Sequence, residues 1–325
     1  MRVVVIGGTG HVGGFLVPRL VRHGHDVTVI TRGPSDPYHP DAAWKDVRRV
    51  HADRAAEDAA GSFGKRVAGY GADAVVDMVC FTPDSARQLA EALRGVTAHL
   101  VHCGTVWVHG VPTEVPVRED AARKPFGDYG VNKAAAEDHL LRQSALGGTP
   151  TTVLHPGHIS GPGWVPVNPA GNFDPAVYGA LARGEEVLLP NAGLETLHHV
   201  HADDVAQAFE SALHDPAASR GRAFHICSEQ ALTLRGYAAE VAGWFGRPAR
   251  LAFAPFEQWA SAVDAQAADI TYDHITHSSN VSIERARRLL GYAPRYSSLQ
   301  AVREALAWLV AEGRVDTGGQ PLNPA

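Results

Sequence analysis

Residues 3–13 read VVVIGGTGHVG, an apolar run that passes directly into a glycine-rich segment. The run predicts a buried strand, and the apolar residues at helical spacing beyond it predict that the glycines open a helix. In this context Gly7 allows the tight turn, Gly10 lets the backbone approach a pyrophosphate, and Gly13 lets the helix pack closely on the strand. The N-terminus of such a helix offers free N–H groups and a positive dipole end to phosphates. The stretch therefore predicts a dinucleotide-binding site.

Strand and helix signals alternate through the first half of the chain and return near its end. Strands are predicted at 3–6, 26–30, 47–51, 74–79, 98–102, 151–155 and 223–227, and helices at 12–21, 55–70, 83–93, 129–146, 203–213, 232–245, 282–290 and 299–312. Apolar strands alternating with helices predict an α/β fold with a doubly wound parallel Rossmann-type sheet. Residues 157–190, rich in glycine and proline, predict irregular loops that contact substrate.

This pattern predicts two domains. Residues 1–160 would form the NAD(P)-binding Rossmann domain, and residues 201–228 would return to it. Residues 161–200 and 229–325 would form a smaller C-terminal α/β substrate lobe.

Composition limits the class of protein. The 325 residues are 45% hydrophobic and 20% charged, which suits a large buried core. The net charge of −6, without a Lys/Arg run, argues against nucleic-acid binding, and the longest apolar runs are too short to span a membrane. Three cysteines without a C-x-x-C pair predict no disulfide framework and no metal site, and they suit the cytoplasm.

The end of the second strand bears on the choice of cofactor. An NAD site usually places a carboxylate there, but residues 30–33 read ITRG. Arg32 can pair with a 2′-phosphate, so the sequence favours NADP over NAD, which stays an alternative. The other interpretation of Arg32 is a solvated surface residue. Asp53, after the third strand, is placed to accept from an adenine amino group or to cap the next helix.

A second motif lies at the start of the helix predicted at 129–146. Residues 129–133 read YGVNK, which puts Tyr129 and Lys133 at i and i+4 on one helix face. Free tyrosine has a pKa of about 10, and a neighbouring ammonium favours its phenolate. Such a tyrosine can exchange a proton with an alcohol or carbonyl oxygen while hydride is transferred at the same carbon.

With these motifs, the chain resembles the extended short-chain dehydrogenase/reductase family, the NAD-dependent epimerase/dehydratase group. The resemblance covers nearly the whole chain and rests on the glycine loop, Asp53, LVHC with TVW at 100–107, YGVNK, HPGHISGPG at 155–163, HADDVA at 201–206 and the segment 282–308. It implies Tyr129 as acid/base, Lys133 on the tyrosine and the nicotinamide ribose, and a homodimer through the helix that carries the tyrosine. It also implies that backbone near Pro156 and His158 lies against the nicotinamide.

Two positions depart from the family pattern. The family usually has a serine or threonine after the fifth strand, where this chain has Cys103; a thiol is a weak donor, so we rank Thr105 above it as the hydroxyl partner of the tyrosine. Many members that act on nucleotide sugars carry an arginine where this chain has Leu197. We therefore expect the substrate to be either a sugar or a nucleotide sugar, and both remain alternatives.

The predicted site residues fall into a cofactor site and a substrate site. The cofactor site is predicted to include Gly7, Thr9, Gly10, His11, Val12, Gly13, Arg32, Asp53, Lys133, Pro156 and His158, and the substrate site Trp107, Trp164, Asn172 and His199. His201 is expected to be structural, with Asp203 or Asp204 capping the helix that follows.

Three functions fit these residues. The leading one is an epimerase/dehydratase-type oxidoreductase that exchanges hydride at a hydroxyl or carbonyl carbon of a sugar-like molecule. The alternative is an NADPH-dependent ketone or aldehyde reductase. A non-enzymatic cofactor-binding or RNA-associated protein ranks behind both.

Overall fold

The computed structural model describes residues 1–33, 36–37 and 39–323. At its centre is a 7-stranded sheet in the order β11-β6-β5-β4-β1-β2-β3. Its strands, all parallel to their neighbours, are β1 (Arg2–Ile6), β2 (Asp26–Thr31), β3 (Arg48–His51), β4 (Ala74–Asp77), β5 (His99–Cys103), β6 (Thr151–Pro156) and β11 (Ala223–Ile226). The order changes direction between β1 and β4, which confirms the predicted doubly wound sheet.

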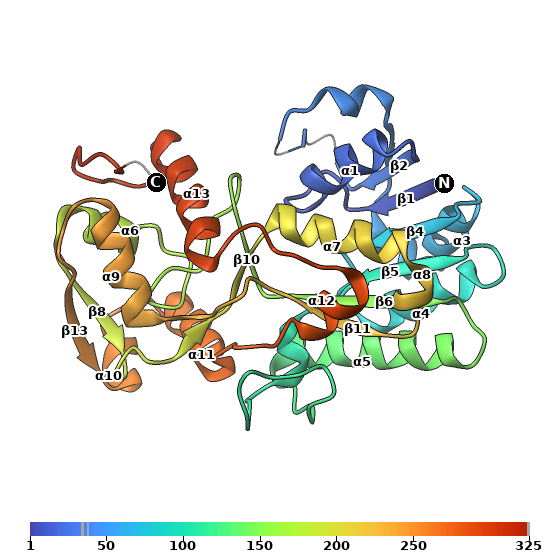
Figure 1. Cartoon of the computed structure of the whole chain (residues 1–325). Coiled ribbons are helices and arrows are strands. Elements are labelled where there is room, and N and C mark those ends of the chain that lie inside the picture. The colour runs from blue at the N-terminus through green and yellow to red at the C-terminus, as the bar shows by residue number, and fades with distance from the viewer. Residues whose placement is uncertain (34–35, 38, 324–325) are drawn as a thin grey trace.

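Helices cover both faces of this sheet (Figure 1). One face carries α1 (Gly13–Arg22) and α7 (Ala202–His214), and the other carries α3 (Phe63–Ala68), α4 (Pro83–Leu93) and α5 (Gly127–Ala145). Shorter elements connect them: η1 (Ala42–Asp46), α2 (Arg54–Ala59), η2 (Val106–His109) and α8 (Pro216–Ser219).

Alternation along β1 explains why both faces are covered. Val3 and Val5 enter the hydrophobic core shared with α1 and α7, whereas Val4 and Ile6 enter the core on the opposite face. Successive side chains of a strand point to opposite sides, so an unbroken apolar run requires a partner on each.

The rest of the chain forms a smaller lobe with its own core (Figure 1, left). It contains the paired strands β9 (Thr196–Leu197) with β12 (Leu232–Thr233), and β8 (Glu186–Pro190) with β13 (Arg250–Ala254). A further pair, β7 (His158–Ser160) with β10 (His199–His201), packs Ile159 and Val200 into the core shared with α1 and α7. Its helices are α6 (Ala176–Arg183), α9 (Leu234–Trp244), α10 (Phe256–Ala260), α11 (Ala265–His277) and α13 (Ser298–Ala311). The buried hydroxyls of Tyr178 and Tyr237 lie 2.7 Å apart at the centre of this core.

Three local expectations differ from the structure. The helix expected at 55–70 is two helices, because Gly61 turns the chain between them with φ +64°. The segment 157–190 holds β7, α6 and β8 rather than irregular loops alone. The sequence also did not predict α11, since its buried face is made largely of small or polar residues such as Thr271 and His274 and has no apolar period.

The packing of α12 (Glu284–Leu290) bears on the domain boundaries. Residues 281–292 contribute Val281, Ile283, Ala286, Leu290 and Tyr292 to the same core as α1 and α7. We propose the two-domain division expected above, with residues 281–292 added to the nucleotide-binding domain. In the described part of the chain, none of the helices combines the length and apolar character needed to cross a membrane.

Candidate active site

The turn between β1 and α1 is a cradle of glycines. A Cβ on Gly13 would lie 2.2 Å from the carbonyl oxygen of Gly8, and one on Gly7, whose φ is +83°, would lie 2.6 Å from Cγ1 of Val79. Side chains are therefore excluded where helix and strand meet. The N-cap residue of α1 is Val12, whose side chain cannot accept hydrogen bonds. In the first turn, Gly14 and Phe15 donate to backbone carbonyls, which leaves the N–H of Gly13 for a ligand. This cradle fits the diphosphate of a dinucleotide.

Two hollows meet at this cradle and share Gly7, Gly10 and Val79 among their lining residues. One, of about 580 Å³, lies toward the ends of β2 and β3; the other, of about 410 Å³, lies toward β5 and α5. The first is lined by the predicted residues Gly7, Thr9, Gly10, Arg32 and Asp53, and the second by Gly7, Gly10, His11, Val12, Gly13 and His158. Their arrangement suits the two nucleoside halves of a dinucleotide. Pro156 lies within β6 beside Ile226, and its neighbour Gly157 lines the second hollow.

The first hollow is lined by Arg54, whose ion pair with Asp77 the sequence did not predict. Arg54, at the start of α2, pairs with the buried Asp77 at the end of β4, Nη1 to Oδ1 2.5 Å. Asp53 caps α2 by accepting from the backbone N–H of Ala56 at 3.1 Å. Arg32 is exposed at the rim. The capping alternative for Asp53 is thus present, and its contact with adenine stays a prediction.

Tyr129 and Thr105 lie together in the second hollow, with Cys103 beside them. Burial of the phenol, and then the Cys103 thiol, raise the pKa of Tyr129 to about 12, and a hydrogen bond with Thr105 opposes the rise. The residue as a whole is 43% exposed, so its ring edge contacts solvent while its hydroxyl end is enclosed. The phenol is therefore protonated at neutral pH, ready to donate.

Lys133 is buried one turn after Tyr129. Its ammonium donates to the carbonyl oxygens of Cys103 at 2.5 Å and Cys80 at 2.9 Å. Burial and Cys103 raise the pKa of Tyr129, whereas Lys133 directs its ammonium to the two carbonyls, so the lowering expected from Lys133 stays a prediction.

Cys103 and Thr105 differ in what they can donate. Burial raises the pKa of the Cys103 thiol, which keeps it neutral and a weak donor. Thr105 accepts from the backbone N–H of Trp107 at 3.3 Å and caps η2, which fixes its hydroxyl near Tyr129. Cys103 and Thr105 thus both lie beside Tyr129, and Thr105 is the stronger hydrogen-bond donor of the two.

Aromatic rings form the walls of the second hollow. Trp107 meets the ring of Tyr129 edge-on at 5.7 Å and stacks on His277 at 4.1 Å, and Trp164 stacks on His11 at 5.6 Å. The hollow is also lined by residues that the sequence analysis did not assign to it, namely Met78, Val79, Val106, Gly157, Ile159, Val167 and Phe173. Two of these, Met78 and Val79, follow directly after β4, and the carboxyl ends of parallel strands are where such sites form, so that signal could have found them.

Two residues predicted to contact substrate, Asn172 and His199, lie behind the residues that line the second hollow. The Asn172 side chain is buried, accepts from Asn168 Nδ2 at 2.6 Å and donates to the hydroxyl of Thr271 at 3.1 Å. His199 is buried with Nε2 3.2 Å from the carbonyl oxygen of Val167. Val167 lines the second hollow, but Asn172 and His199 are not among its described lining residues. These two side chains therefore support the wall of the hollow from behind and do not form it.

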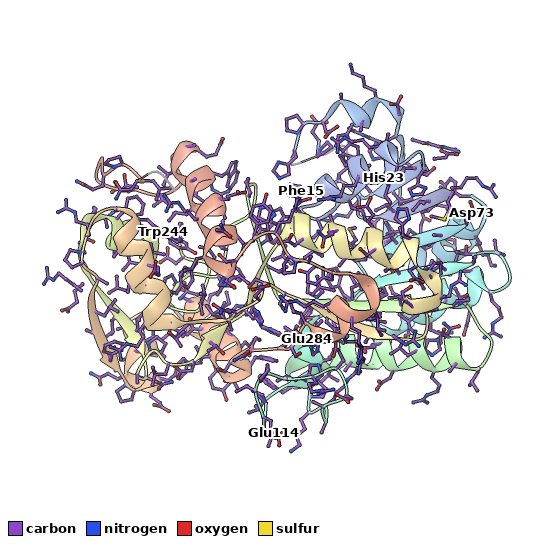
Figure 2. All side chains as sticks on the ribbon, viewed as in Figure 1. Phe15, His23, Asp73, Glu114, Trp244 and Glu284 are labelled. Atoms are coloured by element: carbon purple, nitrogen blue, oxygen red, sulfur yellow. The ribbon has the colours of Figure 1, made fainter. Side chains whose placement is uncertain are left out.

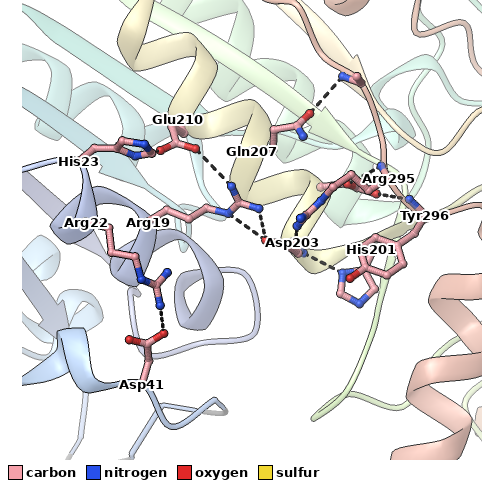
Figure 3. A network of polar contacts seen from close by, with 12 residues as sticks. Arg19, Arg22, His23, Asp41, His201, Asp203, Gln207, Glu210, Arg295 and Tyr296 are labelled. Carbon is pink, nitrogen blue, oxygen red and sulfur yellow. Dashed lines mark hydrogen bonds and ion pairs between the residues drawn. The ribbon is translucent and has the colours of Figure 1, made fainter.

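The HADDVA segment joins distant parts of the chain (Figure 3). His201, and not Asp203 or Asp204, caps α7: its Nδ1 accepts from the backbone N–H of Asp203 at 3.0 Å. Asp203 instead pairs with Arg19 of α1, Nε to Oδ1 2.9 Å, and with Arg295. The capping prediction was therefore wrong, because the carboxylates are used for ion pairs and hydrogen bonds across the fold.

The fold and the glycine cradle define a dinucleotide-binding oxidoreductase of the short-chain dehydrogenase/reductase type. Comparison with known sequences gives its family: the chain belongs to the NAD dependent epimerase/dehydratase family, whose profile matches residues 3–227. It is accordingly an NAD(P)-dependent enzyme, as the sequence predicted.

Individual relatives cover nearly the whole chain. The 2′-dehydrokanamycin reductase of Streptomyces kanamyceticus is 29% identical over 97% of this chain and 86% of its own length. A chloroplast stem-loop binding protein of 41 kDa from Arabidopsis thaliana is 26% identical over 94% of this chain and 78% of its own. The crystal structure of UDP-glucose 4-epimerase from Thermotoga maritima superposes with a TM-score of 0.73 at 18% identity, over 96% of this chain and 99% of that one, which confirms the fold.

Proposed function

We propose that this enzyme reduces a ketone of a sugar-like small molecule at the expense of NADPH, with Tyr129 as the proton donor. The observation that carries the proposal is the enclosed hydroxyl of Tyr129, which lies with Thr105 in a hollow that adjoins the glycine cradle. The nicotinamide cofactor, when bound there, supplies the hydride. Thr105 orients the phenol and the carbonyl oxygen, and Tyr129 donates its proton to that oxygen.

Lys133 is a positioning residue in this proposal. Its hydrogen bonds to Cys80 and Cys103 tie α5 to the ends of two strands, and so set the distance between Tyr129 and Thr105. The aromatic rings of Trp107 and Trp164 would stack on the apolar faces of a sugar ring.

Arg32 supports NADP as the preferred cofactor. It follows β2 at the rim of the first hollow, within a segment that carries no carboxylate, and its guanidinium can pair with a 2′-phosphate. NAD remains the alternative, and Asp53 could serve either cofactor at the adenine.

The lining of the second hollow favours an uncharged substrate over a nucleotide diphosphate. The described lining residues include no arginine and no lysine, and the histidines His11 and His158 have pKa values lowered mainly by burial, so they are neutral. Leu197, at the position of the family's arginine, is fully buried in the core of the smaller lobe. A diphosphate needs cationic partners, whereas an uncharged keto-sugar does not. The relative 2′-dehydrokanamycin reductase is named for a reduction, which favours a reductase here too.

Redox-neutral epimerisation is the second candidate, and membership of the epimerase/dehydratase family favours it. An RNA-binding role is weakened by the net charge of −6 and the lack of a Lys/Arg run. We also propose that the enzyme forms a homodimer through α5 and that it is located in the cytoplasm.

One experiment separates the two enzymatic candidates. Purified protein is denatured, the released dinucleotide is quantified, and NADPH consumption is followed with keto-sugars and with UDP-hexoses. A protein that is free of dinucleotide and consumes NADPH in step with alcohol formation supports the reductase. Stoichiometric, tightly held dinucleotide with conversion of a UDP-hexose would contradict it.

A further inference from the structure

Three buried histidines gather at the edge of the central sheet, outside the two hollows. They are His109 at the end of η2, His155 on β6 and His225 on β11, and the last two are direct register partners. One ring nitrogen of each lies within 4.8 Å of the others. All three side chains are at most 3% exposed.

The hydrogen bonds of this cluster (His109, His155, His225) fix two of its tautomers. Nδ1 of His225 lies 3.1 Å from the carbonyl oxygen of Ser282, and because a carbonyl only accepts, Nδ1 carries the proton. Nε2 of His225 is then a lone pair and accepts from Nε2 of His109 at 2.8 Å. Nδ1 of His109 is left with a lone pair, buried and without a hydrogen-bond partner among the described residues.

The third ring is oriented by a carboxylate. Nε2 of His155 donates to Glu137 Oε2 at 2.5 Å, and Arg123 donates to the other oxygen of Glu137 at 2.5 Å. Glu137 thus pairs at one oxygen with His155 and at the other with the guanidinium of Arg123. Nδ1 of His155 is also buried and lacks a partner among the described residues. An imidazole held by a carboxylate through one nitrogen and free at the other is the usual arrangement of a metal-binding histidine.

We propose that His109, His155 and His225 bind one divalent transition-metal ion, with Zn²⁺ as the first candidate. Three neutral imidazoles and an open position suit Zn²⁺, and imidazole sites also take Ni²⁺, Co²⁺ and Cu²⁺. Zn–N bonds of about 2.0–2.1 Å put tetrahedral ligand nitrogens about 3.4 Å apart. For the ion to replace the His109–His225 hydrogen bond, the two Nε2 atoms would separate by about half an ångström, and the proton of His109 would move from Nε2 to Nδ1, which has no other partner among the described residues.

The cluster is reachable from solvent. His109 lines a hollow of about 440 Å³ under the loop at 110–122, together with Glu114 and Asp120. Figure 2 shows Glu114 at the outer end of this loop, below α5. Arg118 also lines this hollow and pairs with Asp120 at 3.5 Å, so Glu114 is the carboxylate that would attract a cation toward His109.

The position of the cluster indicates a structural effect on the active site. Gly104 separates Cys103 from Thr105, and a Cβ placed on it would lie 2.6 Å from Cδ2 of His155. Glu137, which orients His155, follows Lys133 by one turn of α5. A bound ion would thus stiffen the surface behind Thr105. The proposal does not depend on the reaction catalysed.

Metal binding to the full chain tests the proposal directly. The protein, without a histidine tag and stripped with chelator, is titrated with Zn²⁺ by calorimetry and with Co²⁺ by visible absorption. We expect one equivalent with a Kd in the micromolar range or tighter, and Co²⁺ bands typical of a four-coordinate nitrogen site. His109→Gln and His225→Gln should each weaken binding at least tenfold, and Glu137→Gln about 10–100-fold.

A matched control disrupts another candidate group. His23, Glu210 and His214 have similar spacing, with both histidines exposed and Glu210 buried, so His214→Gln should leave the binding unchanged. Circular dichroism and NADPH binding would check that each variant is folded. His109→Gln should tolerate the substitution best, because His109 lines the hollow under the loop at 110–122. The proposal is overturned if the wild-type chain binds no ion, if folded His109→Gln binds as the wild type does, or if binding is lost in His214→Gln instead.

Discussion

The ammonium of Lys133 lies 2.5 Å from the carbonyl oxygen of Cys103 and donates to it. Because Lys133 also donates to Cys80, one side chain connects α5 with the chain segments that follow β4 and β5. The segment that carries Thr105 is therefore held against the helix that carries Tyr129.

Replacing Lys133 tests this connection. In Lys133→Met two carbonyl oxygens lose a charged donor, so the free energy of unfolding should fall by about 1.5–3 kcal/mol and turnover should fall with it. Urea denaturation and steady-state rates measure both. Lys65→Met, an exposed lysine on α3, serves as the control. Unchanged stability and unchanged turnover in Lys133→Met would contradict the role assigned to this residue.

The partner of the phenol is tested by comparing two variants. Thr105→Val removes the hydroxyl and keeps the shape, so we expect kcat to fall about 100-fold, as for the loss of one hydrogen bond to a reacting oxygen. Cys103→Ala should change kcat much less, because the thiol is a weak donor. The reverse order of effects would assign the role to Cys103.

Cofactor preference is tested at Arg32. Arg32→Ala should weaken NADPH binding by about 10–100-fold, corresponding to the loss of a charge-assisted hydrogen bond, and leave NADH binding nearly unchanged. Fluorescence titration with both dinucleotides gives the two Kd values. Arg94→Ala, an exposed arginine at the end of α4, is the matched control. Equal losses for the two cofactors would remove Arg32 from 2′-phosphate recognition.

The buried pair of Asp77 and Arg54 predicts a pH-dependent stability. Burial alone would raise the pKa of Asp77, but Arg54 overcomes this and lowers it below the ordinary 3.8. A lowered carboxyl pKa contributes stability that is complete above the ordinary value and is lost as pH falls through the lowered one. Asp77→Asn should cost about 3 kcal/mol at neutral pH, the lower end for a broken buried pair, because Arg54 keeps its contact with Asp58 at 3.3 Å.

Unfolding of wild type and Asp77→Asn between pH 2 and pH 7 measures this contribution. The difference between the two proteins should be constant above about pH 5 and shrink in strongly acidic solution. A difference that is independent of pH would show that Asp77 acts through packing alone.

Some of this structure could be predicted from the sequence because the signals are local. Strands β1 and β4 of the central sheet are short, nearly unbroken apolar runs, and the glycine loop follows the first of them within one short stretch. In α11, by contrast, the buried positions are small or polar, which hides the helical period. Contacts between distant residues, such as Lys133 with Cys80 or His155 with His225, depend on how the strands are ordered and leave no pattern along the chain.

The central claim is that Tyr129 donates the proton, and Tyr129→Phe tests it most directly. The measurement is the rate of NADPH-dependent ketone reduction together with the Kd for NADPH, with Tyr272→Phe, an exposed tyrosine on α11, as control. We predict a loss of about 100- to 10,000-fold in rate for Tyr129→Phe, with NADPH affinity and the control variant unchanged. A Tyr129→Phe enzyme that keeps the wild-type rate would contradict the account.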